Sequence, residues 1–226
     1  MGSFKKSRKI GIHKIVVSAI FLFLLSFNSF SQELPQNGTV VKGVAALDYS
    51  VPDTLNVNIG SDKVITNWDS FNVGSGKTVN FNRDSSFIAL NRVTGADPSS
   101  IFGTINATNG QIFLVNPNGI IFGSGSHVNA AGLVASTLDI TNENFMAGRY
   151  EFFKVAGKNG YIVNKGIIKT TKPGGYVCLF SQAIDNQGVA IADLGTVALA
   201  AGEEITMSLD DKGTISVVVA KEVQSQ

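Results

Sequence analysis

Few residues in this 226-residue chain have the types and spacing that chemistry requires. Two carboxylate pairs, Glu203-Glu204 and Asp210-Asp211, raise the question of glycoside hydrolysis, which needs two carboxyl groups facing one cleft. Adjacent residues of a strand point to opposite faces, and Asp-Asp-Lys-Gly at Asp210 is typical of a turn. The pattern therefore argues against an enzyme, and a carbohydrate-active β-helix remains only as an alternative.

Three other reactive candidates also have structural interpretations. Gly74–Thr78 (GSGKT) ends like a phosphate-binding loop, but Phe71 stands where Walker A requires its first glycine, so we expect a connecting turn. Cys178, the only cysteine, lies in an apolar run and is predicted to be a buried, unreactive hydrophobe. His127 is the only histidine after residue 31, which argues against a histidine-based metal site. The sequence therefore predicts no catalytic residue, no cofactor and no metal ligand.

The most informative segment, QIFLVNPNGIIFG at residues 111–123, is chemically inert. Its turn-forming residues are Asn116, Pro117, Asn118 and Gly119, and they stand between two short apolar runs. These runs are β-branched or aromatic and too short for helices, so they are predicted to be buried strands. From the residues alone the segment is a turn between strands, with recognition by a partner as the alternative.

The N-terminal segment, residues 1–31, has the features of a Sec signal peptide. A basic stretch without acidic residues precedes the apolar run Ile15–Leu25, and Ser29-Phe30-Ser31 provides a small-x-small cleavage pattern. A membrane anchor is the alternative. Residues 32–226 then form one domain by length and carry 18 − 5 = 13 basic against 17 acidic residues, a formal charge of −4. Nucleic acid is not expected as a partner, because binding it needs a basic face.

The elements that would position these residues are predicted to be almost entirely strands. Short β-prone runs are interrupted by Gly, Asn or Asp every 8–12 residues, whereas only Glu143–Tyr150, after Thr141-Asn142, could form a helical turn or two. Leu34–Asn58 alternates apolar and polar residues and is expected to cap the fold, and residues 62–94, with Trp68, to pack on its inner face.

The last third of the chain contains a repeat. Ile162–Ile168 aligns with Ile184–Ala190, and Gly175–Leu179 aligns with Gly195–Leu199. Such a repeat favours an all-β parallel β-helix, with ladders of Asn and aliphatic side chains, over a β-sandwich. At about 22 residues a coil, the domain would have on the order of nine coils.

Five segments in order along the chain resemble the secretion domain of two-partner secretion exoproteins, the module at the N-terminus of filamentous haemagglutinins, related adhesins, haemolysins and contact-dependent inhibition toxins. The resemblance extends from about Gly38 to Val219. The segments are VITNWDSFNVGSGKTVNF (64–81), ALNRVTG (89–95), QIFLVNPNGIIFG (111–123), VNAAGLVASTLDI (128–140) and LGTVALAAGEEITM (194–207).

The resemblance implies a right-handed parallel β-helix and a role in export. After Sec export, the POTRA domains of a dedicated outer-membrane transporter would recognise the domain in the periplasm, and the exoprotein would fold at the bacterial cell surface. In the family the asparagines of the NPNG turn matter for secretion, and they match Asn116 and Asn118, while Pro117 and Gly119 match as the residues that shape the turn. The supporting matches are Asn91, Arg92, Gly132, Ser136 and Thr137.

The NPNL-type tetrapeptide seen in some members is absent. The passenger is expected to be an adhesin, a haemolysin or a contact-dependent toxin. The alternative is a free-standing surface β-helix adhesin that binds a host ligand.

Overall fold

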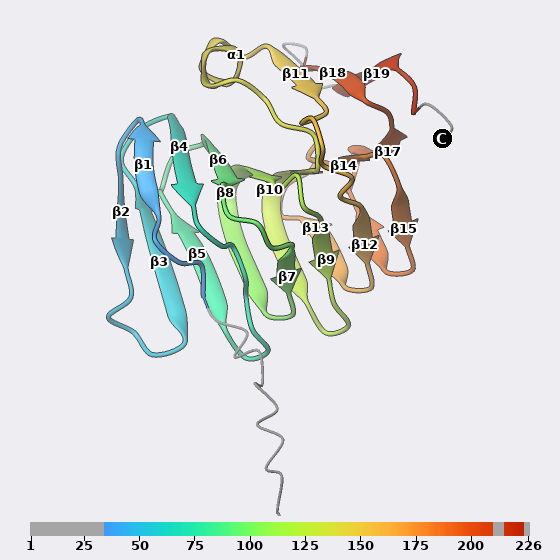
Figure 1. Cartoon of the computed structure of the whole chain (residues 1–226). Helices are drawn as coiled ribbons and strands as arrows, with labels where there is room; N and C mark the ends of the chain where they lie inside the picture. The colour runs from blue at the N-terminus through green and yellow to red at the C-terminus, as the bar shows by residue number, and fades with distance from the viewer. Residues whose placement is uncertain (1–33, 210–214, 224–226) are drawn as a thin grey trace, which may run out of the picture.

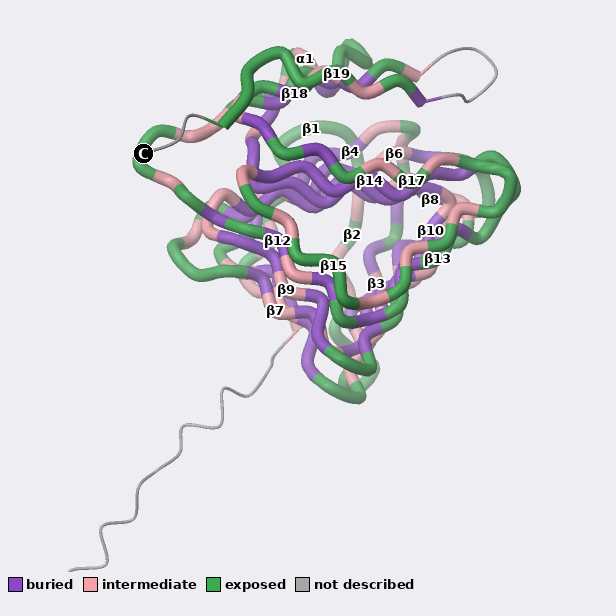
Figure 2. Tube along the Cα trace, turned by 90° about the vertical axis from the view of Figure 1, so that its right-hand side faces the viewer, coloured by how far each residue is buried: buried purple, intermediate pink, exposed green. Residues whose placement is uncertain are grey.

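The computed structural model describes residues 34–209 and 215–223, and the expected signal peptide and the Asp210-Asp211 turn lie outside them. The described chain coils into a parallel β-helix with three faces (Figures 1 and 2). Face 1 consists of β3 (Thr54–Ile59), β5 (Thr78–Asn82), the first halves of β8 (Thr104–Val115) and β10 (His127–Ser136), β13 (Ile167–Thr170) and β16 (Val189–Ile191).

Faces 2 and 3 complete each coil. Face 2 consists of β4 (Lys63–Trp68), β6 (Phe87–Val93), the second halves of β8 and β10, β14 (Tyr176–Ser181) and β17 (Thr196–Ala201). Face 3 consists of β7 (Ser99–Ile101), β9 (Ile120–Phe122), β12 (Ile162–Asn164) and β15 (Ile184–Asn186). The expected parallel β-helix is thereby confirmed, and the β-sandwich is not the fold.

The repeat seen in the sequence is the coil repeat of the structure. Ile162 pairs with Ile184 and Val177 with Val197, in the register that the two alignments predict. Asn164 Nδ2 donates to Asn186 Oδ1 at 2.8 Å, which is the expected asparagine ladder. A second ladder, which the repeat did not reveal, connects Asn129, Asn106, Asn80 and Asn56 on face 1 by bonds of 3.0–3.1 Å.

The β-helix has about six coils, so the expectation of nine is wrong. Some coils are longer than the sequence repeat, because Thr54 pairs with Thr78 and Thr78 with Thr104. In addition, one long segment leaves the coils, because His127 pairs with Ile167, which lies much further along the chain than one coil repeat. The chain between these last two residues contributes to a separate layer.

The N-terminal coil is capped by two antiparallel strands, β1 (Thr39–Lys42) on β4 and β2 (Ala45–Asp48) on β3. Such strands cover edges that would otherwise expose unpaired backbone groups. The expected cap at Leu34–Asn58 is therefore correct up to β2, whereas β3 already belongs to the first coil.

The extra-helical layer lies over the outer side of face 2 (Figure 2). It consists of α1 (Asn142–Ala147) and an antiparallel sheet of β11 (Tyr150–Phe153), β18 (Glu204–Leu209) and β19 (Ile215–Lys221). Thr141 caps the N-terminus of α1, and Gly148, at φ 75°, ends it. The predicted helical turn is thus present, but its last three residues, Gly148, Arg149 and Tyr150, lie outside the helix.

Two hydrophobic cores result from this arrangement. The first fills the inside of the β-helix and contains Trp68, Phe71, Phe81 and Phe87, as expected for residues 62–94. The second lies between face 2 and the extra-helical layer, where the ring of Phe113 contacts those of Phe145, Tyr150 and Phe152 at centroid distances of 5.5, 5.0 and 6.2 Å. Strands of face 2 are therefore buried on both sides, which explains continuous apolar runs such as Ile112–Val115.

Candidate functional site: the NPNG turn and its supports

The NPNG segment is a tight turn at the corner between faces 2 and 3, and it connects β8 to β9 as predicted. The Gly119 N–H donates to the Asn116 carbonyl at 3.1 Å and closes the turn. Asn116 Oδ1 accepts hydrogen bonds from the backbone N–H and the side-chain amide of Asn118, both at 3.0 Å. This is the local bonding by which asparagine favours turns. Gly119 has a φ of 128°, a conformation that a side chain would disfavour.

Asn116 is fully buried and also connects neighbouring coils. Its Nδ2 donates to the Asp97 carbonyl and to Ser99 Oγ, each at 3.0 Å, and its backbone N–H donates to the Ser136 carbonyl at 2.9 Å. The side chain therefore makes four hydrogen bonds, two within the turn and two to the preceding coil. A buried amide bonded in this way fixes the position of the turn.

The next coil covers the turn. From the next coil, Lys158 Nζ donates to Asn118 Oδ1 at 2.7 Å. On the other side, Asn118 Nδ2 donates to the carbonyl of Gly95 in the preceding coil at 2.9 Å. Gly160 lies so close that a Cβ there would be 2.5 Å from the Pro117 carbonyl oxygen. Lys158 was not predicted, and no local signal could have found it, because it lies 40 residues beyond its partner.

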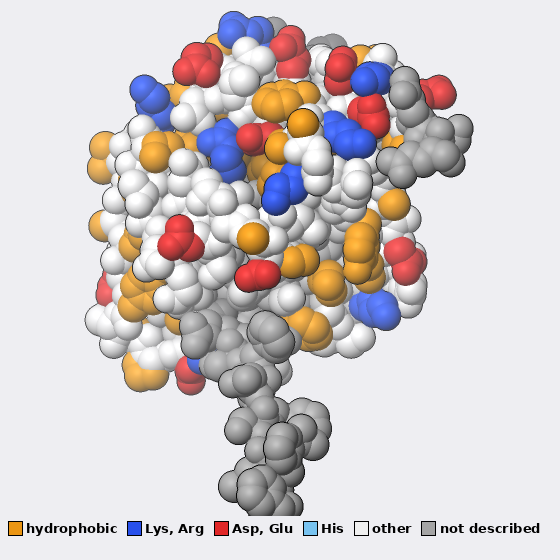
Figure 3. All heavy atoms as spheres, viewed as in Figure 1, with side chains coloured by type: hydrophobic (Ala, Val, Ile, Leu, Met, Phe, Trp, Pro, Cys, Tyr) orange, Lys and Arg blue, Asp and Glu red, His pale blue; other side chains and the backbone are white. Residues whose placement is uncertain are grey.

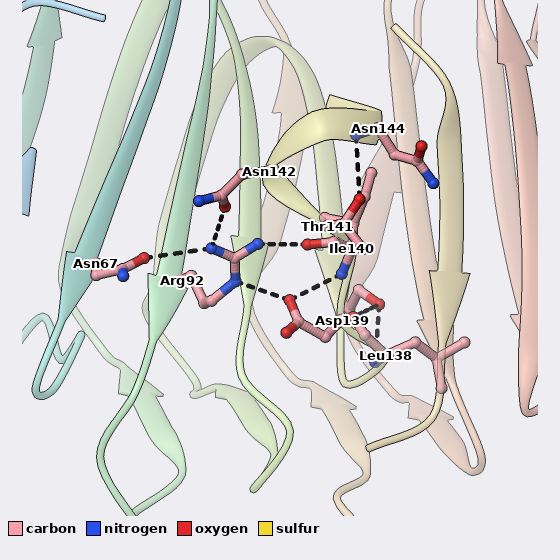
Figure 4. Close-up of polar contacts among 9 residues, drawn as sticks. Asn67, Arg92, Leu138, Asp139, Ile140, Thr141, Asn142 and Asn144 are labelled. Carbon is pink, nitrogen blue, oxygen red and sulfur yellow. Dashed lines mark hydrogen bonds and ion pairs between the residues drawn. The ribbon is translucent and has the colours of Figure 1, made fainter. Parts of the chain in front are cut away.

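Arg92 holds the start of the extra-helical layer on face 2, where it is flanked by Asn67 (Figure 4). Its Nε donates to Asp139 Oδ1 at 2.8 Å, its Nη1 to Asn142 Oδ1 at 2.7 Å, and its Nη2 to the Ile140 carbonyl. Because the ion pair with Asp139 is mostly buried, it is screened less than a surface pair. The sequence indicated Arg92 by family resemblance, but not this contact with the extra-helical layer.

Lys63 makes a second connection to that layer. Its Nζ donates to the carbonyls of Phe145 and Met146 at 3.2 and 3.0 Å, near the C-terminal end of α1. Partial burial lowers the pKa of Lys63. Two cations from face 2, Lys63 and Arg92, therefore hold the two ends of α1.

The other supporting residues of the motif are buried structural groups. Asn91 Oδ1 accepts from the indole N–H of Trp68 at 3.1 Å inside the β-helix. Gly132 leaves room for the ring of Tyr176, since a Cβ there would be 2.7 Å from that ring. The Ser136 hydroxyl donates to the Leu138 carbonyl, and Thr137 Oγ1 lies 2.8 Å from Ser181 Oγ.

Strand pairing brings most of these residues together. Arg92 pairs with Val115 and Val115 with Ser136, so Arg92, the NPNG turn and Ser136-Thr137 lie at the same end of neighbouring strands. Asn91 is one position further from this end of its strand than Arg92, and Gly132 is at the opposite end of face 2. Apart from Gly132, the motif residues thus shape one corner of the β-helix and the attachment of the extra-helical layer.

The reactive candidates of the sequence lie elsewhere and have structural partners. Lys77 N donates to the Gly74 carbonyl in a turn, as expected for GSGKT, and Lys77 Nζ forms an ion pair with Asp53. Glu203 is paired with Lys221 and Lys154, and the hydrogen bond from Lys221 is the largest of the effects that lower its pKa. Cys178 is fully buried as predicted, and burial raises its pKa to about 12.

The part of the chain that the structure describes has neither a metal cluster nor a membrane-spanning helix. There, no group of three or more His, Cys, Asp or Glu residues is arranged to hold a metal ion. No helix in residues 34–209 and 215–223 has the length and hydropathy of a membrane span. On the face shown in Figure 3, acidic and basic side chains are intermixed.

The fold and the NPNG corner define a parallel β-helix module with an extra-helical layer, and comparison identifies its family. The model of the TPS (two-partner secretion) secretion domain matches residues 31–224. The chain therefore belongs to the TPS secretion domain family. The secretion domain of HMW1 from Haemophilus influenzae, a crystal structure, is similar with a TM-score of 0.75 and 33% identity over 84% of this chain and 50% of that one.

Two curated relatives carry the same name, heme/hemopexin-binding protein of Haemophilus influenzae. The protein of strain ATCC 51907 is 31% identical over 219 residues, which are 93% of this chain and 24% of the relative. The other is 32% identical over 155 residues, which are 67% of this chain and 16% of the relative. This chain thus spans a quarter or less of these relatives, and neither name denotes an enzyme.

Proposed function

We propose that this chain is the N-terminal secretion module of a two-partner secretion exoprotein, recognised in the periplasm by the POTRA domains of a cognate outer-membrane transporter. The Sec machinery would deliver it after reading residues 1–31, and the protein would reach the cell surface or the medium. The observation that carries the proposal is family membership over residues 31–224. The NPNG turn between β8 and β9, whose residues resemble a secretion motif of the family, supports it.

The burial of the turn bears on which state of the chain the transporter would read. Asn116 has no exposed surface, and Lys158 and Gly160 cover Asn118 and Gly119. A partner that contacts the Asn116 side chain must therefore meet the chain before the coils have stacked, whereas Pro117 and Asn118 stay partly exposed in the folded domain. Each coil of a β-helix contacts mainly the coils next to it, so such a chain can fold progressively as it emerges from the transporter.

Exposed apolar side chains on the last described coil support the proposal that a passenger follows this module. Val197 and Leu199 occupy positions that face the interior one coil earlier, where Val177 and Leu179 are almost fully buried, yet they are 42% and 45% exposed. Further coils stacked on β17 would cover them, and the relatives extend well beyond the matched segment. An adhesin, haemolysin or contact-dependent toxin passenger fits this arrangement.

The test is binding of the unfolded segment 32–226 to the isolated POTRA domains of the transporter encoded beside the gene. Asn118→Ile should weaken binding, whereas Asn129→Ile, the same change on face 1, should leave it unaltered. Equal weakening by both variants would remove the special role of the NPNG segment. Absence of binding by the unmodified segment would refute transporter recognition and favour the free-standing surface adhesin.

A further inference from the structure

Three adjoining hollows form a groove at the corner between faces 1 and 2. The first, of about 380 Å³, is lined by Asn80, Asn82, Arg83, Thr108 and Asn109 among others. It shares Asn109 with a hollow of about 190 Å³, which in turn shares Ser86 and Gln111 with a third of about 350 Å³. The lining residues named here define the corner groove, which crosses several coils.

The amide side chains of the groove are held in fixed directions. Asn80 Oδ1 accepts from Asn106 at 3.1 Å, and Asn82 Nδ2 donates to Asn58 Oδ1 at 3.1 Å. Asn109 Nδ2 donates to the backbone carbonyls of Arg83 and Asp84. A side-chain amide has two N–H donors and two acceptor lone pairs, so each retains capacity for a ligand. Asn80 and Asn106 are paired across neighbouring strands, about 4.8 Å apart, so oriented amides recur from one coil to the next beside the groove.

Arg83 adds a cation that is only weakly engaged. Its Nη2 lies 2.6 Å from Asp62 Oδ1, but the Asp62 side chain is 88% exposed. Exposed pairs of this kind contribute little stability. Its Nη1 is buried without a hydrogen-bond partner among the described residues, which is unfavourable for a guanidinium nitrogen. A guanidinium that turned from Asp62 towards the first hollow, which Arg83 lines, could bond an anion there.

The first hollow does not suit the other common ligands. β5 pairs with β3 and β8, and β8 pairs with β6 and β10, so these strands offer no free edge to which an extended peptide could add. The hollow is lined mainly by amide, hydroxyl and charged groups, whereas sites for small apolar ligands are mostly apolar. We propose that the corner groove binds an oligosaccharide that carries a carboxylate or sulfate, with the anion on Arg83 and the hydroxyls on Asn82, Thr108 and Asn109.

Calorimetric titration of the purified chain with three probes tests this site. The probes are a heparin tetrasaccharide, a tetragalacturonate and the neutral cellotetraose. Arg83→Ala should weaken binding of the anionic probe by about tenfold or more, as expected for loss of a charge-assisted hydrogen bond. Asp62→Ala should strengthen it, because it removes the competing carboxylate. Lys77→Ala is the matched control, since Lys77 forms a similar exposed pair with Asp53 at 2.7 Å.

The opposite effects of Arg83→Ala and Asp62→Ala separate ligand binding from a structural role, which would make both changes act alike. Because heparin carries both sulfates and carboxylates, binding of heparin without binding of the galacturonate would identify a sulfate ligand, and binding of the galacturonate a carboxylate ligand. The proposal is overturned if none of the probes binds, if cellotetraose binds as well as the anionic probes, or if Lys77→Ala weakens binding as much as Arg83→Ala. Each outcome is independent of transporter recognition.

Discussion

Replacement of Asn116 by alanine should destabilise the folded domain strongly. The substitution removes two hydrogen bonds to Asp97 and Ser99 and two from Asn118, all at 3.0 Å. One bond contributes about 1 kcal/mol net, and groups left without a partner in a buried position add to the loss. Since the Ser99 side chain is fully buried, we expect the free energy of unfolding to fall by about 3 kcal/mol.

Urea unfolding followed by circular dichroism measures this loss as a lower midpoint at unchanged m-value. Ser99→Ala removes one of the four bonds and leaves the NPNG sequence intact, so its expected loss is about 1 kcal/mol. Asn159→Ala, at an exposed neighbouring position, should cost less than about 0.5 kcal/mol. A loss below about 0.5 kcal/mol for Asn116→Ala would refute the role assigned to its hydrogen bonds.

Three further predictions concern the extra-helical layer, the buried thiol and the cover of the turn. Arg92→Met should raise amide hydrogen exchange in α1 and β11 because it frees the 139–142 segment, whereas Lys77→Met, which loses only the exposed pair with Asp53, should not; unchanged exchange would contradict the anchoring. Cys178 should resist maleimide at pH 8 until the protein unfolds, because its pKa is about 12, and equal labelling of folded and unfolded chains would contradict this. The raised pKa should also lower stability as pH rises from about 9 towards 12, where only the unfolded thiol ionises. Gly160→Ala should lower the melting temperature, because its Cβ would be 2.5 Å from the Pro117 carbonyl oxygen; an unchanged melting temperature would show that the cover adjusts freely.

Ser99→Ala also separates two explanations of the secretion motif. If the transporter reads the NPNG sequence in an unfolded chain, Asn116→Ala should block secretion and Ser99→Ala should not. If secretion depends on the folded turn, both should reduce it in proportion to their loss of stability. The measurement is the amount of protein in the medium when the transporter is coexpressed.

The interior of the fold could be predicted from the sequence, because its signals are local or repeated. The turn at Asn116–Gly119 needs only adjacent residues, and the pairing of Val177 with Val197 follows from the sequence repeat. The burial of Cys178 follows from its apolar neighbours. Each of these predictions depends on residues that are close in sequence or on positions that recur.

The extra-helical layer could not be predicted in the same way. Phe113 points away from the β-helix interior and packs on Phe145 and Phe152, but a strand buried on both sides has the same apolar pattern whichever partner covers it. Arg92 meets Asp139 and Asn142 only after the chain has left the coil repeat, at separations of 47 and 50 residues. The six-residue helix α1 is also too short to be stable alone, so its position depends on these contacts.

The distribution of hydrogen bonds shows how a structural motif could also serve the recognition that we propose. Besides their bonds within the turn, the Asn116 and Asn118 side chains bond to the preceding coil at Ser99 and Gly95, and Asn118 also bonds to Lys158 of the next coil. Lys158 can reach Asn118 only when the coil after the turn has stacked. Before that, the Asn118 carboxamide lacks the bond from Lys158 and is available to a partner. Folding of the next coil would therefore occupy the Asn118 carboxamide, and we expect binding to the transporter to weaken as the domain folds.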